Sequence, residues 1–111
     1  MLVDDEHSVR NVLKRILREF DLVMFGDVPA ALNNFEKGYF RAALIDLGIP
    51  GMTGDELARK LKEIDPDLVT ILITGWEMVA GDSRLEPFDY HVQKPFSLVK
   101  IQNLVRRVAA R

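Results

Sequence analysis

Two kinds of apolar pattern alternate along this chain, and the alternation limits its fold more than any other feature of the sequence. Short apolar runs separate longer stretches in which apolar residues recur every three or four positions. The first pattern is typical of strands buried on both faces, and the second of amphipathic helices. Strands are therefore predicted at residues 1–3, 22–25, 42–45, 68–73 and 90–93. The clearest helical stripes fall at residues 9–20, 28–35, 57–64 and 98–108.

Strands that alternate with helices indicate βα units, a parallel sheet and helices on both of its faces. Five strands and about five helices suit a small doubly wound α/β fold. Two elements are expected to be short. The first strand ends where the chain reaches Asp4, and residues 76–88 leave only 82–86, between Gly81 and Pro87, for a turn or so of a fourth helix.

The composition excludes several classes of protein. A length of 111 residues, 48% of them hydrophobic, fits one domain with a real core, spanning 1–111. Fifteen basic and 17 acidic residues leave a net charge of −2 and no basic stripe, so we expect no direct nucleic-acid binding. The absence of cysteine excludes disulfides and thiolate metal sites. No apolar run approaches the roughly 20 residues of a membrane span, and we expect a cytoplasmic protein.

Polar residues follow four of the five predicted strands. Asp4 and Asp5 follow the first, Asp46 the third, Thr74 the fourth and Lys94 the fifth. The carboxyl ends of parallel strands meet at one edge of the sheet, where ligands of such folds bind. We therefore expect three carboxylates, a hydroxyl and an ammonium to converge there.

Taken singly, each of these residues has a plainer interpretation. Asp4 or Asp5 alone suits a cap of the first helix, Asp46 a turn, Thr74 a strand end and Lys94 a solvated charge. Together they point to a cation, because three clustered carboxylates repel one another and raise one another's pKa. A site made of oxygen atoms suits Mg²⁺.

The same residues suit phosphoryl chemistry. A carboxylate can act as a nucleophile and form an aspartyl phosphate. Transfer of a phosphoryl group requires mainly positioning and neutralisation of charge. Mg²⁺ and the lysine would supply positive charge, and the hydroxyl would donate a hydrogen bond to a phosphoryl oxygen.

At this point the chain resembles the CheY-like receiver domain of two-component response regulators. The matching segments are Val3-Asp4-Asp5-Glu6, Leu44-Ile45-Asp46, Ile49-Pro50-Gly51-Met52-Thr53-Gly54, Ile73-Thr74-Gly75 and Lys94-Pro95-Phe96. Forty residues lie between Asp5 and Asp46, 27 between Asp46 and Thr74, and 19 between Thr74 and Lys94. The resemblance covers the whole chain and implies a flavodoxin-like five-stranded parallel sheet with strand order 2-1-3-4-5.

The resemblance also implies how a metal is held. Asp46 would be the phosphoacceptor and would share Mg²⁺ with Asp5. The carbonyl oxygen of Gly48 would be a further ligand, and Asp4 would bind the metal through water.

For the remaining site residues the resemblance implies roles in the switch. Thr74 would move toward the phosphoryl group and Lys94 would pair with it. The Lys94–Pro95 peptide is similar to one that is cis in this family, a geometry that costs little before proline.

The partners and the signalling role also follow from the resemblance. The chain would receive its phosphoryl group from a histidine kinase or a histidine phosphotransfer protein and pass the signal to an attached output domain or a partner. It would catalyse its own phosphorylation and dephosphorylation without being a turnover enzyme. Whether it forms a dimer stays open.

Three departures from the family pattern affect this interpretation. His91 stands where the family often has a Tyr or Phe switch residue; it could serve as a titratable ring or simply be exposed on an edge strand. The short 76–88 segment puts the family's signalling face in doubt. Because the chain reaches Asp4 so early, we expect that a few N-terminal residues are missing and that the domain can belong to a longer protein.

Trp76, two residues after Thr74, is expected near the mouth of the site. There it could shield an acyl phosphate from water or dock a partner. The plainer interpretation is a tryptophan that covers loose apolar surface.

Two other classes of function compete with the phosphorylated switch. One is a receiver-like interaction module that works without phosphorylation, which the short fourth helix favours and the full set of acidic, hydroxyl and lysine residues opposes. The other is a phosphatase or a nucleotide-binding enzyme. A phosphatase would need a second acid where Gly48 stands, and Asp4-Asp5-Glu6 would repel phosphates where a nucleotide binder needs a glycine-rich loop.

Overall fold

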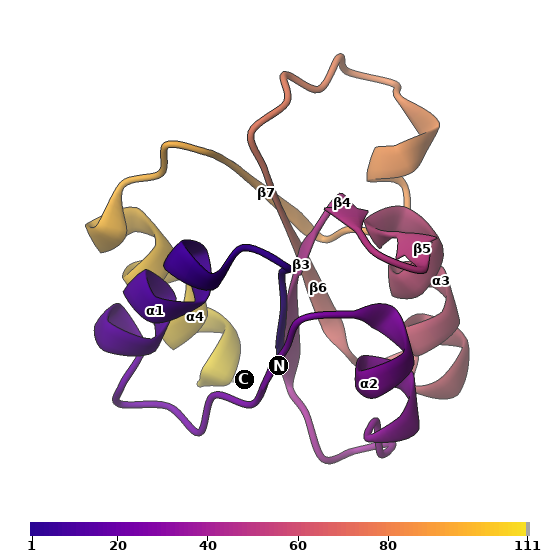
Figure 1. Cartoon of the computed structure of the whole chain (residues 1–111), viewed down its shortest axis with the longest axis horizontal. Helices are drawn as coiled ribbons and strands as arrows, with labels where there is room; N and C mark the ends of the chain where they lie inside the picture. Colours follow the sequence, from indigo (N-terminus) through magenta and orange to yellow (C-terminus); the bar gives the residue numbers. More distant parts are fainter. Residues whose placement is uncertain (111) are drawn as a thin grey trace.

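The computed structural model describes residues 1–110, which form a central parallel sheet between two layers of helices (Figure 1). The sheet consists of β1 (Leu2–Val3), β2 (Met24–Phe25), β3 (Ala42–Asp46), β6 (Val69–Thr74) and β7 (Tyr90–Gln93). The helices are α1 (His7–Ile16), α2 (Val28–Asn33), α3 (Gly54–Ile64), the short 3₁₀ helix η1 (Ser83–Leu85) and α4 (Leu98–Ala109). A small hairpin of β4 (Gly48–Ile49) and β5 (Met52–Thr53) lies between β3 and α3.

The strand order is β2-β1-β3-β6-β7 with every pair parallel, which confirms the predicted order 2-1-3-4-5. Helices α1 and α4 cover one face of the sheet, and α2 and α3 cover the other (Figure 1). Neighbouring strand residues serve opposite faces: Leu44 packs in the core under α1 and α4, whereas Ile45 packs in the core under α2 and α3. This is why the strands read as continuous apolar runs.

The first two helices are shorter than their apolar stripes predicted. Helix α1 ends at Ile16 rather than near residue 20, and its last carbonyl accepts a hydrogen bond of 3.0 Å from Gln102 Nε2 of α4. Leu17 and Phe20 still pack against the α1 and α4 core, so the apolar spacing continues into a turn. Likewise α2 ends at Asn33, and Phe35 stacks on a ring of the following loop.

The hairpin β4–β5 was not predicted and shapes the loop after Asp46. Its turn contains Gly51 in the left-handed region, with φ of 95°. Gly54 then passes so close to β3 that a Cβ atom there would lie 2.2 Å from the Asp46 carbonyl oxygen. Gly54 N also donates a hydrogen bond of 2.7 Å to the carbonyl of Leu47. Only glycine fits this contact, which holds the Asp46 backbone against the start of α3.

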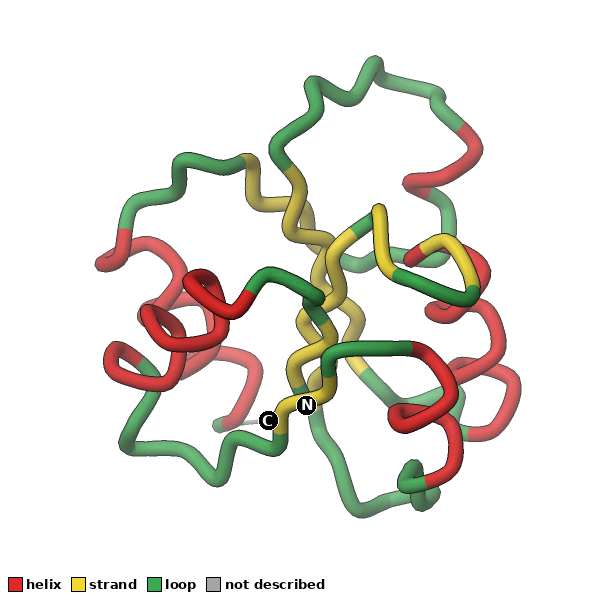
Figure 2. Tube along the Cα trace, in the orientation of Figure 1, coloured by secondary structure: helices red, strands yellow, loops and turns green. Residues whose placement is uncertain are grey.

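The segment between β6 and β7 contains only η1, three residues long, so the expected short fourth helix is confirmed. Figure 2 shows the segment as a long loop that projects from one end of the sheet. Its second half is tied to the body by side chains. Arg59 Nη2 donates to the Ser83 carbonyl at 2.8 Å, and Thr70 Oγ1 donates to the Pro87 carbonyl at 2.5 Å. Within residues 1–110, no helix has the length and apolar character needed to cross a membrane.

Candidate functional site

The polar residues that follow the strands lie together at the carboxyl end of the sheet. Asp4 follows β1, Asp46 and Thr74 end β3 and β6, and Lys94 follows β7. A cavity of about 320 Å³ opens at this edge. It is lined by Asp5, Glu6, Asp46, Gly48, Thr74, Gly75, Trp76 and Lys94.

The three aspartates form a compact acidic cluster. One carboxylate oxygen from each of Asp4, Asp5 and Asp46 lies within 4.8 Å of the other two. Asp4 and Asp46 are buried and Asp5 is exposed. The pKa of Asp46 is raised to about 6, first by burial and then by the charges of Asp4 and Asp5, while Lys94 and the Leu47 N–H act to lower it. The Asp46 carboxylate is thus in an environment that favours an added positive charge.

Asp4 is oriented by the loop that leads into α1. Its Oδ1 accepts a hydrogen bond of 2.9 Å from the backbone N–H of Glu6, and its carbonyl accepts one of 2.7 Å from Arg10 Nη1. Helix α1 begins only after Glu6, with no side-chain cap at that position. Asp4 therefore does not cap the helix, as the plainer interpretation had suggested, and its second oxygen faces Lys94.

Lys94 is the cation that the structure places in the acidic cluster. Its Nζ lies 3.2 Å from Asp4 Oδ2, 3.3 Å from Glu6 Oε1 and 3.7 Å from Asp46 Oδ1. Burial acts to lower the pKa of Lys94, but the Asp4 and Asp46 carboxylates outweigh it and the pKa is raised, so the ammonium stays charged. The Lys94–Pro95 peptide bond is cis.

Thr74 and Trp76 line the same cavity as Asp5. Thr74 is buried, and its Oγ1 accepts a hydrogen bond of 3.1 Å from the backbone N–H of Trp76. The Trp76 side chain is 56% exposed. Its six-membered ring leans over Gly48, where a Cβ atom would lie 3.9 Å from Trp76 Cη2. A Cβ atom at position 48 would therefore make ordinary van der Waals contact with this ring.

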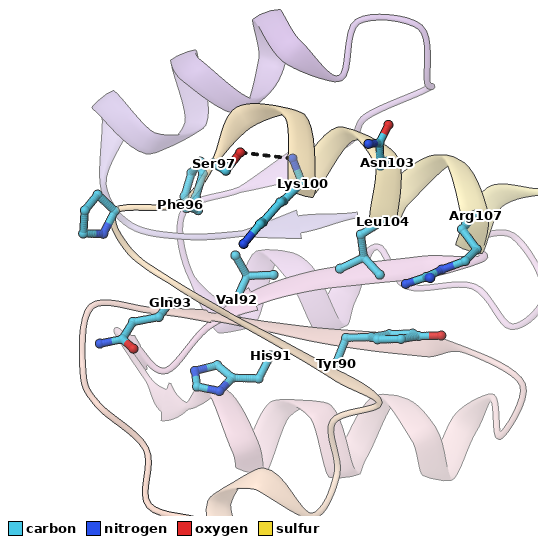
Figure 3. A pocket seen from close by; sticks show the side chains of 11 residues that line it. Tyr90, His91, Val92, Gln93, Phe96, Ser97, Lys100, Asn103, Leu104 and Arg107 are labelled. Carbon is cyan, nitrogen blue, oxygen red and sulfur yellow. Dashed lines mark hydrogen bonds between the residues drawn. The ribbon is translucent and has the colours of Figure 1, made fainter.

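His91 lies apart from this cavity. It is exposed on the edge strand β7, where it pairs with Leu72. Figure 3 shows it with Tyr90 and Gln93 beside a larger cavity of about 740 Å³ between β7 and α4. This position matches the plainer of the two interpretations made from the sequence, and a switch role for His91 stays a prediction.

Three contacts at or near the site were missed from the sequence. Glu6 approaches Lys94, although its place beside the acidic pair could have suggested this. Gly54 packs against the Asp46 backbone, and the second glycine so soon after Gly51 was the one feature of the sequence that could have indicated this contact. Arg84 lies over the Trp76 ring, with 5.9 Å from its Cζ to the ring centroid, and no spacing pattern announces a contact between two loop residues.

The donor set fits a hard divalent cation. It consists of carboxylate oxygens from three residues, with the backbone of Gly48 lining the same cavity. Mg²⁺ prefers such oxygen ligands and keeps several waters, which suits a cavity that opens to solvent. A nucleophilic carboxylate, a buried hydroxyl and an ammonium beside such a cation are the parts needed for phosphoryl transfer.

Comparison with known proteins identifies the family. The family profile described as "Response regulator receiver domain" matches residues 1–106. The response regulator receiver protein CpdR of Brucella abortus (strain 2308) is 32% identical over 112 residues, with coverage of 97% of this chain and 93% of CpdR. The sensory transduction protein RegX3 of Mycolicibacterium smegmatis (strain ATCC 700084 / mc(2)155) is 30% identical over 120 residues, and this chain spans only 50% of its length.

Among solved structures, the response regulator protein TrrA of Thermotoga maritima in complex with Mg(2+)-BeF superposes with a TM-score of 0.86 at 27% identity. The match covers 96% of this chain and 95% of that one. TrrA bound to the histidine kinase ThkA matches with a TM-score of 0.85, again at 27% identity, over 96% of this chain and 94% of the matched one. Profile, relatives and fold agree, and the chain belongs to the response regulator receiver domain family of two-component systems.

Proposed function

We propose that residues 1–111 form one domain that acts as a phosphorylated signalling switch, with Asp46 as the phosphoacceptor. The observation that carries the proposal is the acidic cluster. Three carboxylates lie within 4.8 Å of one another beside the Lys94 ammonium, at the edge of the sheet where α/β folds bind ligands. Such a cluster has little use in stability alone, because like charges repel.

Mg²⁺ is the cofactor that this donor set suits. Asp5 and Asp46 would bind it through carboxylate oxygens, Gly48 through its carbonyl, and Asp4 through water. Bound there, the ion would neutralise charge on the phosphoryl oxygens. Lys94 would neutralise the remaining charge. Its Nζ contacts Asp4 and Glu6 and lies 3.7 Å from Asp46 Oδ1, so it can turn toward a phosphoryl group on Asp46.

The transfer would begin with a phosphohistidine on a histidine kinase or a histidine phosphotransfer protein. An Asp46 carboxylate oxygen forms a bond to phosphorus, the bond between phosphorus and the histidine nitrogen breaks, and the freed imidazole takes up a proton. Lys94 pairs with the added negative charge. Thr74 then turns its hydroxyl toward the phosphoryl oxygens and releases the Trp76 N–H that it holds at 3.1 Å.

The partners are inferred from the relatives. TrrA is seen bound to the histidine kinase ThkA, which supports a kinase as the donor for this chain. RegX3 is about twice as long as the matched region, which supports an attached output domain in longer relatives. In this scheme the chain modifies itself and hands on a conformational change, in the cytoplasm, and turns over no separate substrate.

The deciding experiment is phosphorylation by a small donor. With Mg²⁺ and phosphoramidate, the wild-type chain should gain the mass of one phosphate in intact mass spectrometry, and Asp46→Asn should gain none. Asp21→Asn, which removes an exposed carboxylate at the other end of the sheet, is the matched control and should be labelled like wild type. Equal labelling of wild type and Asp46→Asn would refute the assignment of Asp46.

A further inference from the structure

Trp76 is held at two points, and only one of them is near the acidic cluster. Its backbone N–H donates to Thr74 Oγ1 at the site. The residue is 56% exposed, so packing in a core does not fix the indole. The second point is Arg84, whose Cζ lies 5.9 Å from the ring centroid, within the range of a cation–π contact.

Arg84 is itself aligned by Asp82. Arg84 Nε and Nη2 donate to the two oxygens of Asp82 at 3.1 and 2.8 Å, a paired geometry that fixes the plane of the guanidinium. Asp82 Oδ1 also accepts the backbone N–H of Arg84 at 3.0 Å and so caps η1. Arg59 Nη2 then ties η1 to α3 through the Ser83 carbonyl at 2.8 Å. The Arg84 guanidinium is therefore held in place by Asp82, and η1, the helix that contains Arg84, is attached to α3.

The indole in turn borders the phosphoryl site. Trp76 lines the cavity that contains Asp46 and Thr74, and its six-membered ring overhangs Gly48. An acyl phosphate on Asp46 decays when a water oxygen forms a bond to phosphorus and the bond to the Asp46 oxygen breaks. Asp46 leaves as a carboxylate, and the phosphate released keeps the oxygen of the water. A ring held across the cavity slows the approach of that water.

We propose that Arg84, aligned by Asp82, is a positioning residue that holds the Trp76 indole across the phosphoryl site and lengthens the lifetime of the aspartyl phosphate. The inference rests on the proposed function, because it assigns a regulator to the same site. It also gives a role to the segment between β6 and β7. In place of a full helix, this segment contains Arg84 and Asp82, which position the Trp76 indole.

The lifetime is measured by phosphorylating the chain with phosphoramidate and Mg²⁺, removing the donor and following the loss of phosphate by intact mass. Arg84→Ala should shorten the half-life about two- to fivefold, the fold-change that an exposed cation–π contact supports. Asp82→Asn keeps a cap acceptor but loses the charge, and should shorten it less. Arg84→Lys keeps a cation over the ring and should restore part of the lifetime.

The chain offers a matched control. Arg107 Cζ lies 5.7 Å from the Tyr90 ring centroid, a cation–π contact of similar length between α4 and the half-buried Tyr90 of β7. Arg107→Ala should leave the half-life unchanged. In a Trp76→Ala background, Arg84→Ala should have no further effect. If the two changes instead multiply, Arg84 acts on the phosphoryl group directly and the positioning role is refuted.

A second measurement needs neither phosphate nor metal. The time-resolved fluorescence anisotropy of Trp76, the only tryptophan, reports how freely the indole moves. Arg84→Ala should increase its fast depolarisation in the apo chain, and Arg107→Ala should not. An unchanged anisotropy would refute the positioning role. If the wild type takes no phosphate while Arg84→Ala still increases the fast depolarisation, the proposed function and the lifetime effect are refuted and the contact between Arg84 and Trp76 stands.

Discussion

Two regions share the carboxyl end of the sheet and are held there in different ways. The end of β3 at Asp46 is surrounded by buried strands and pressed against α3 at Gly54. The loop at residues 75–82 projects from the same end, with Trp76 and Val79 exposed, and its support comes from side-chain contacts such as that of Arg84. In the proposed switch, the phosphoacceptor lies in the rigid region and the indole that would cover it lies in the less stable loop. A switch needs both, since moving elements come from the low end of local stability.

Amide exchange should separate the two regions most strongly. Amides of β3 and β6 are expected to exchange roughly a thousandfold or more slowly than those of residues 76–82, because core strands open only with global unfolding. Beryllofluoride with Mg²⁺, a phosphoryl mimic, should slow exchange in residues 75–93. Thr74→Ala should remove most of that slowing. Hydrogen exchange read by mass spectrometry checks this, and equal protection of β6 and the loop would remove the contrast.

Two glycine substitutions probe the same contrast in stability. Gly54→Ala would place a Cβ atom 2.2 Å from the Asp46 carbonyl oxygen, and we expect a loss of about 3 kcal/mol from the free energy of unfolding. Gly81 has φ of 91° but open space around it, so Gly81→Ala should cost only about 1 kcal/mol, from the backbone conformation. Urea denaturation measures both. If Gly81→Ala lost more free energy of unfolding than Gly54→Ala, the loop would be the more rigidly packed of the two regions.

Mg²⁺ should stabilise the rigid region by binding only to the folded chain. At a hundred times its dissociation constant it should add about 2.7 kcal/mol to the free energy of unfolding and raise the melting temperature. Asp5→Asn should weaken this gain because it removes an exposed carboxylate from the cluster. Asp21→Asn is the control and should keep the full gain. Melting curves of the three proteins that do not respond to millimolar Mg²⁺ would contradict the metal site.

The contributions of Asp46 and Asp82 to the free energy of unfolding should change with pH in opposite directions. The pKa of Asp46 is raised to about 6, so its protonated form stabilises the fold below pH 4 and this contribution is lost as the pH rises to about 6. Asp46→Asn should therefore be more stable than wild type at pH 7 without Mg²⁺, by about 1 kcal/mol after allowance for solvent screening. Urea midpoints between pH 4 and 7 measure this.

Asp82 in the loop is the counterpart. Its pKa is lowered to about 2, first by the hydrogen bonds from Arg84, so its contribution is present above pH 4 and is lost as the pH falls toward 2. Asp82→Asn should therefore flatten the acid side of the stability curve, where Asp46→Asn flattens the region from pH 4 to 6. Curves that change in the same direction would contradict the assigned environments.

Much of the fold could be predicted because buried parallel strands leave a plain signal. The strand predicted at 68–73 is observed as β6, Val69–Thr74, and the strand predicted at 90–93 is observed as β7, Tyr90–Gln93. The convergence of Asp4, Asp46, Thr74 and Lys94 followed from the geometry of a parallel sheet alone, while their roles came from the resemblance and stay proposals.

What could not be predicted depends on tertiary contacts. The end of α1 is set partly by Gln102, 86 residues away, which no local spacing reveals. The strands of the β4–β5 hairpin have two residues each, too few for any periodicity. The contact between Arg84 and Trp76 joins two residues of an irregular loop, where only the folded path of the backbone brings them together.

The ion pair between Lys94 and Asp4 spans 90 residues and has a consequence for biosynthesis. A chain grows from its N-terminus at about 5–20 residues per second, so the aspartates emerge several seconds before the lysine. During that interval an unfinished chain holds its acidic residues without the ammonium that balances them. We expect such a nascent chain to be a poor acceptor of phosphate, so that a kinase meets a responsive partner only after nearly the whole domain has been translated.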